Sequence, residues 1–179
     1  MKIDGIGEFK TVAGELYGPT MKFESLKLKY CFVLEEYDED PNKDEFHSAM
    51  KNFSLNFEES LKEAKTHIYD YYLDLKGEYE DDEFMSEILP EIKSSEDVCK
   101  YIELGDEMRV GRRPYGDQKI YISIECGCDW EEEHGLQIVS KEGKFINKVG
   151  EYDGHHTNSD AYDNDSLESV VYKKMDTES

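Results

Sequence analysis

One apolar stripe of helical period in the middle of the chain constrains the fold more than any other feature. Its members recur at steps of three or four residues: Phe46, Met50, Phe53, Phe57, Leu61, Ala64, Ile68, Tyr72 and Leu75. This spacing is typical of the buried face of an α-helix. A stripe of about 30 residues exceeds the usual helix length of 8–20 residues. Asn52, Ser54 and Asn56 have weak helix propensity and good capping chemistry, so we expect a break there and a second helix capped by Ser54 or Asn56.

Strand patterns flank this helical region. Apolar residues alternate with other residues over 26–34, which predicts a strand with one buried face. Residues 101–126 predict an antiparallel hairpin around a glycine-containing loop, and residues 136–149 predict a second hairpin. Residues 166–175 predict a short final helix.

A chain of 179 residues is long enough for one domain with a hydrophobic core. We therefore expect a single α+β domain over 1–150, in which an antiparallel β-sheet packs against a central helical hairpin. The helices should cover one face of the sheet. Residues 151–179 are expected to form an acidic, partly ordered C-terminal extension.

The net charge is −22, from 43 acidic and 21 basic residues. Such a surface repels phosphate backbones and anionic membranes, so nucleic-acid and membrane binding are disfavoured. The charge serves either solubility or association with a basic protein, as when an inhibitor captures a nuclease. The start of the chain lacks a signal-peptide-like apolar run, and the four cysteines are irregularly spaced, so we expect a cytoplasmic protein with reduced thiols.

Reactive residue types crowd into the segment Cys126–Gly135. It holds the only tryptophan, two of the four cysteines and one of the five histidines. Trp130 to His134 can form one helical turn that Gly135 ends, with Trp130 and His134 on the same side. The interpretation we favour is structural: Trp130 plugs one end of the sheet, His134 bonds a neighbouring carbonyl or carboxylate, and Gly135 supplies a left-handed turn.

Two chemical alternatives exist for the same segment. Zinc would need four ligands, which Cys126, Cys128, His134 and either His155 or His156 could supply. No second matched ligand pair is present, so this pattern is weak. An enzyme would use Glu133 or His134 as a general base. Because no nucleophile, phosphate loop or serine elbow accompanies them, we favour a protein that is not an enzyme and has no cofactor.

All three arginines of the chain, Arg109, Arg112 and Arg113, fall within five residues at a hairpin tip. Arginine grips carboxylates and phosphates through a bidentate fork. The cluster predicts either an anionic ligand or acidic partners within the protein, and an exposed loop with salt bridges is the simpler interpretation.

Oxygen-bearing side chains also gather near the C-terminus, where they could suit calcium: Asp153, Asn158, Asp160, Asp163 and Asp165. Their spacing departs from an EF-hand loop, and the distant bidentate glutamate is missing. We therefore favour a solvated acidic tail.

Three parts of the chain resemble an uncharacterised bacterial family with a domain of unknown function. The segment 41–72 resembles its proline-initiated helix pair, and 89–104 resembles its connection. Cys128, Trp130, Glu133, His134 and Gly135 match its Cys-x-Trp-x-x-Glu-His-Gly signature. The resemblance implies a bacterial, intracellular protein and supplies no activity. It weakens the zinc alternative, because Cys126 lies outside the signature.

Together these patterns predict a small, acidic, non-catalytic module that binds a basic protein, such as an immunity or accessory factor. The alternative is an enzyme or metal-binding protein that uses Cys128, Glu133 and His134. The sheet edge is expected to present Trp130, Glu133 and His134.

Overall fold

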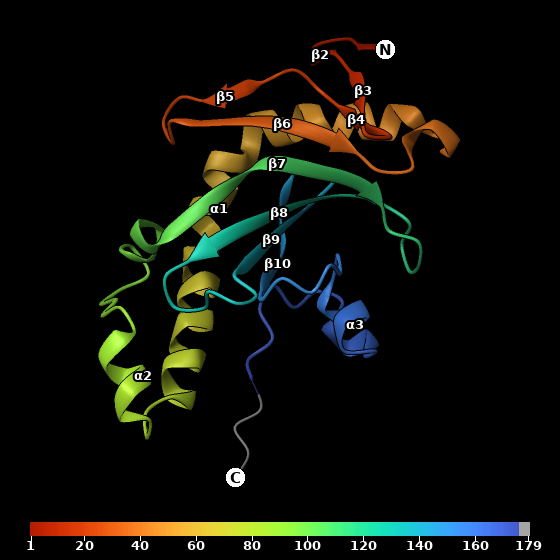
Figure 1. Cartoon of the computed structure of the whole chain (residues 1–179). Helices are drawn as coiled ribbons and strands as arrows, with labels where there is room; N and C mark the ends of the chain where they lie inside the picture. The colour runs from red at the N-terminus through yellow and green to blue at the C-terminus, as the bar shows by residue number, and fades with distance from the viewer. Residues whose placement is uncertain (176–179) are drawn as a thin grey trace.

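The computed structural model describes residues 1–175, and its largest element is an eight-stranded sheet that one long helix crosses (Figure 1). The strand order is β10-β9-β8-β7-β6-β4-β3, with β5 also paired to β6. The strands are β3 (Lys10–Val12), β4 (Glu15–Tyr17), β5 (Met21–Phe23), β6 (Leu28–Leu34), β7 (Ile102–Arg112), β8 (Ile120–Cys128), β9 (Leu136–Lys141) and β10 (Phe145–Gly150). A separate pair, β1 (Lys2–Ile3) and β2 (Gly7–Glu8), lies at the N-terminus.

The helix α1 (Lys43–Glu78) is continuous over 36 residues, so the predicted break at residues 52–56 is wrong. The three polar residues bond without capping a new helix. Asn52 Nδ2 donates to the Glu142 carbonyl at 3.1 Å, Ser54 Oγ donates to the Met50 carbonyl at 3.0 Å, and Asn56 Nδ2 donates to the Asn52 carbonyl at 2.8 Å. Burial of the apolar face outweighs their weak propensity.

The predicted helical hairpin is therefore one helix followed by short elements. These are α2 (Glu83–Ile88) and a 3-10 turn at Val98–Tyr101 before β7; a further 3-10 turn lies at Tyr37–Glu39 before α1. The single α+β domain itself is confirmed, as are the strand at 26–34 and both predicted hairpins, which are β7–β8 and β9–β10.

One strand pair departs from the antiparallel expectation. β6 and β7 run parallel, with Cys31 to Leu34 opposite Glu107 to Val110, and α1 forms the crossover between them. Parallel neighbours need such a long connection. The ladder covers only these four pairs, so the first halves of β6 and β7 separate (Figure 1). β7 also bulges between Leu104 and Met108, opposite β8.

The hydrophobic core lies between α1 and the face of the sheet that we call the helix face. Aromatic rings carry much of it: Phe23 stacks on Tyr30 with ring centroids 4.3 Å apart, and Phe53 stacks on Phe57 at 4.6 Å. Ile122 and Ile124 of β8 complete this layer. Alternate residues of β8, such as Tyr121 and Ser123, point to the opposite side, which we call the open face.

The C-terminal segment returns to the open face instead of forming the predicted helix at 166–175. It contains α3 (Asn158–Ala161) and a 3-10 turn (Asp165–Leu167). The Val171 carbonyl accepts from the Val149 backbone at 2.7 Å, and His156 stacks on Tyr121. The predicted helix is therefore replaced by the short 3-10 turn, this single backbone bond to β10, and bonds from Tyr172 and Met175 to Asp74 of α1. The end of the predicted extension, 176–179, lies outside the described residues.

Within residues 1–175, no helix combines the length and the apolar character needed to cross a membrane.

Candidate functional site

The segment Cys126–Gly135 forms the turn between β8 and β9. Trp130 is 3% exposed and packs edge-on against Tyr71 and Tyr72 of α1, at centroid distances of 6.1 and 5.9 Å. Trp130 therefore closes one end of the core, as the structural interpretation predicted. It is not presented at a sheet edge. The predicted helical turn is wrong, because the described segment between β8 and β9 contains turns and no helix.

Gly135 and Glu131 shape this turn. Gly135 has φ of +66°, and a Cβ there would lie 2.6 Å from the Cys126 carbonyl oxygen, so the predicted left-handed glycine is confirmed. Glu131 Oε1 accepts from the backbone N–H groups of Glu133 at 2.8 Å and His134 at 3.1 Å. The same oxygen lies 3.7 Å from His134 Nδ1. One carboxylate thus holds the backbone of the turn, and the His134 imidazole lies near it without a hydrogen bond to it.

The predicted zinc ligands do not meet. Cys126 and Cys128 are buried in the core on the helix face, where burial raises the pKa of each thiol to about 12. His155 and His156 belong to the segment that crosses the open face. Among the described residues, no group of three or more histidine, cysteine, aspartate or glutamate side chains could hold a metal ion. The proposed zinc and calcium clusters are therefore not assembled.

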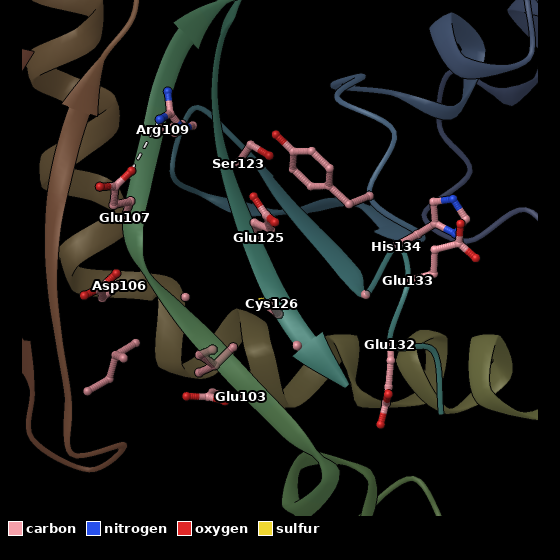
Figure 2. A pocket seen from close by; sticks show the side chains of 16 residues that line it. Glu103, Asp106, Glu107, Arg109, Ser123, Glu125, Cys126, Glu132, Glu133 and His134 are labelled. Atoms are coloured by element: carbon pink, nitrogen blue, oxygen red, sulfur yellow. Dashed lines mark hydrogen bonds and ion pairs between the residues drawn. The ribbon is translucent and has the colours of Figure 1, made fainter. Parts of the chain in front are cut away.

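Carboxylates line a hollow of about 670 Å³ on the open face, which we call the acidic hollow (Figure 2). They come from β7, β8 and the β8–β9 turn: Glu103, Asp106, Glu107, Glu125, Glu132 and Glu133. His134 lies beside Glu133, and Ser123 lies along β8 from Glu125 (Figure 2). The structure thus brings Glu133, His134 and Gly135 of the signature to one hollow, while Cys128 and Trp130 remain in the core.

Sequence reasoning missed the four carboxylates of the strands. Four more acidic residues do not stand out in a chain that contains 43 of them. Alternation along β8 could have placed Glu125 on the face that Ile124 does not occupy. In β7 the bulge interrupts the alternation, so it does not predict which face Glu103, Asp106 and Glu107 share. Gly105 sits in that bulge, where a Cβ would lie 2.1 Å from the Glu125 carbonyl oxygen.

Arg109 is the one arginine at the acidic hollow, and its charge is already matched. Its Nη1 donates to Glu15 Oε1 at 2.9 Å and to Glu35 Oε1 at 3.1 Å, and its Nη2 donates to Glu107 Oε2 at 3.3 Å. The hydrogen bond from Arg109 lowers the pKa of Glu15. The acidic hollow therefore keeps a negative balance.

The other two arginines also bond acids of the protein. Arg112 donates to Asp40 and Glu45, both at 2.6 Å. Arg113 is 3% exposed and donates to Asp160 at 2.7 Å and Glu168 at 2.6 Å. Of the two predicted roles for the cluster, the structure supplies the acidic partners within the protein, but the expected exposure of the loop is wrong for Arg113, which is buried against them.

A buried lysine was not anticipated. Lys148 of β10 donates to Gln137 Oε1 at 3.0 Å, to the His155 carbonyl at 3.3 Å and to Asp153. Burial lowers the pKa of Lys148, and Asp153 opposes that shift. Asp153 and Asp160, two of the calcium candidates, thus bond Lys148 and Arg113 instead of converging.

Comparison with protein families gives one match. The model of a domain of unknown function, DUF6985, matches residues 5–157, which is more than four fifths of the chain. The chain belongs to the DUF6985 family. The resemblance to a family of unknown function is confirmed at this level, while the proposed signature and the bacterial origin stay predictions. Neither the curated proteins nor the solved structures that were compared include a match.

Proposed function

We propose that this DUF6985 protein is a non-catalytic binding module whose acidic hollow receives a basic segment of another protein. The observation that carries the proposal is the acidic hollow itself, where six carboxylates surround about 670 Å³ and the only arginine is already paired. The net charge of −22 would attract a basic partner over a longer range. The proposal also takes the protein to be bacterial and cytoplasmic, as the family resemblance implies.

The rims of the hollow suit a flexible cationic side chain. Glu103, Glu125 and Glu132 are exposed, so they can bond an incoming lysine or arginine. Complementary charges of this kind speed association and favour the correct partner more than they add affinity. An immunity or accessory role toward a basic protein would use such a surface. The enzyme alternative at Glu133 and His134 stays a prediction, since both side chains line the same hollow.

The test compares two charge-matched triple variants in pull-downs with basic proteins encoded beside the gene. The first variant, Glu103→Gln/Glu125→Gln/Glu132→Gln, removes charge from the acidic hollow. The control, Glu63→Gln/Glu80→Gln/Asp81→Asn, removes the same charge from exposed residues outside it. We expect a complex at about 50 mM salt that weakens at about 500 mM, because salt screens exposed charges.

The hollow variant should lose the complex and the control should keep it. Equal loss in both variants would show that net charge alone attracts the partner. Recovery of no basic protein at low salt would remove the main support for the proposal.

A further inference from the structure

A second hollow, of about 610 Å³, opens toward α1 where β6 and β7 separate. Its walls are apolar and come from the β5–β6 turn, the start of β6, α1, the turn before β7, and β7: Leu26, Leu28, Leu61, Cys99, Ile102 and Leu104. Lys27, Lys62 and Lys65 stand around it. We call this site the lysine-rimmed pocket.

The pocket exists because the parallel ladder is short. Pairing of β6 with β7 begins at Cys31 and Glu107, so Leu28 and Leu104 lie outside it. Both leucines pack against the core but remain partly exposed, as do Leu26 and Ile102. Apolar side chains from separate segments thus share one partly open cavity, whose volume falls in the range of about 300–1,000 Å³ that is common for small-molecule sites.

The charge around this pocket differs from that of the rest of the protein. Three lysines line it against two acids, Glu58 and Glu103, although acids outnumber bases 43 to 21 in the whole chain. Long lysine side chains can lie along apolar walls and keep the ammonium group at the rim. With Glu59 and Glu96, which pair with Lys62 and Lys65, the acids at this rim number four against three lysines, so an anionic group above the apolar floor would bind by displacing these pairs.

Lys62 and Lys65 can exchange their present carboxylate partners for the carboxylate of a ligand. Lys62 pairs with Glu59 at 2.8 Å, and Lys65 pairs with Glu96 at 2.7 Å. The two glutamate side chains are 72% and 79% exposed, so these pairs contribute little and can give way to another carboxylate. Among the described residues, Lys27 forms no ion pair within 4.0 Å.

We propose that the lysine-rimmed pocket binds a small amphipathic carboxylate, with an aliphatic tail against Leu28, Leu61 and Leu104 and the carboxylate at Lys62 and Lys65. Leu28, Glu103 and Leu104 line both sites, but the lysine-rimmed pocket has three lysines in its lining and the acidic hollow has none. It does not depend on the proposed binding of a basic protein.

The test is calorimetric titration of the full chain with decanoate and with the uncharged decanol, together with mapping of the affected residues by NMR. Decanoate should bind about fivefold more tightly than decanol. The variant Lys62→Gln/Lys65→Gln should weaken decanoate about tenfold and leave decanol unchanged. The Lys62 side chain is 64% exposed and the Lys65 side chain 21%, and glutamine keeps most of the aliphatic stem, so the fold should persist.

The matched control is Lys22→Gln/Lys100→Gln, which removes the same charge from two surface ion pairs outside the pocket. This control should bind decanoate like the parent chain. Absence of binding, equal affinity for decanoate and decanol, equal weakening by both double variants, or NMR changes centred on the acidic hollow would each overturn the proposal.

Discussion

The helix face and the open face of the sheet are covered by different kinds of interaction. On the helix face, α1 buries aromatic and aliphatic side chains such as Phe53, Phe57 and Ile124. On the open face, residues 153–168 of the C-terminal segment attach through charged side chains, chiefly Arg113 and Lys148, whereas Tyr172 and Met175 beyond them bond Asp74 of α1. Apolar burial has no direct dependence on pH, whereas ion pairs require each partner to keep its charge.

This difference suggests a division of roles. The helix face supplies the stability of the fold through burial of apolar area, at roughly 25 cal/mol per Å². The open face retains polar groups and the acidic hollow, which water and a partner can reach. We therefore expect substitutions on the two faces to act on different properties of the protein.

The largest expected effect is on the helix face. Phe53→Ala removes a fully buried ring that packs edge-on against Phe23 and Phe32. The cavity should lower the free energy of unfolding by about 3–5 kcal/mol in urea titrations. Leu55→Ala on the same helix is the control: Leu55 is 83% exposed, so its change should stay within about 0.5 kcal/mol. Similar losses in both variants would contradict this packing.

The next effect tests the open face. Arg113→Met leaves Asp160 and Glu168 without their buried partner, which should cost about 2–3 kcal/mol. The loss should first appear as faster proteolysis within residues 151–168, which include both partners of Arg113. Arg109→Met is the control, because its three glutamate partners are 41–42% exposed and such pairs contribute about 0–1 kcal/mol. Global unfolding without early cleavage of the segment would show that the two faces are not separable.

A smaller effect compares two glycines with positive φ. Gly135 ends the β8–β9 turn, which is tied to α1 because Tyr71 OH donates to the Gly135 carbonyl at 3.2 Å, while Gly154 lies in the open-face segment. Gly154→Ala meets no atom within 4 Å and should cost about 1 kcal/mol from φ alone. Gly135→Ala also meets the Cys126 carbonyl, so it should cost about 2 kcal/mol. Equal unfolding midpoints for the two variants would show that the contact with the Cys126 carbonyl adds no cost at Gly135.

Local patterns in the sequence predicted the elements of the fold but not their long-range partners. The apolar stripe located α1, and alternation located β6 and both hairpins. The continuity of α1 depends partly on the bond from Asn52 to Glu142, which lies in a hairpin 90 residues later. The parallel pairing of β6 with β7 likewise depends on a crossover of the whole helix, which periodicity does not encode.

The candidate site was predicted only in part, because local patterns again do not show which distant residues lie together. Glu133, His134 and Gly135 stood out because unusual residue types gather in a short segment, and they do line the acidic hollow. The carboxylates of β7 and β8 carry no local signal in so acidic a chain. Arginine clustering indicated acidic partners, but the partners of Arg113 lie 47 and 55 residues away, beyond any local pattern.

Lowering the pH should weaken the interactions on the open face before those on the helix face. Hydrogen bonds from Arg113 lower the pKa of Glu168, and they also lower the pKa of Asp160 despite the opposing effect of burial. A carboxyl group whose pKa is lower in the folded protein stabilises it above the unfolded pKa, near 4. That contribution is lost as the pH falls through the folded pKa. The attachment of the C-terminal segment should therefore weaken below about pH 4, before the apolar helix face is affected.

Hydrogen exchange measured by mass spectrometry between pH 7 and about pH 3, corrected for intrinsic rates, tests this division most directly. The amides of Ala161, Asn164 and Val170 bond within the C-terminal segment, and those of β8 bond within the sheet. We predict that the segment loses protection as the pH falls while β8 keeps it. Loss of protection in both regions at the same pH, or loss in β8 at a higher pH than in the segment, would contradict the account.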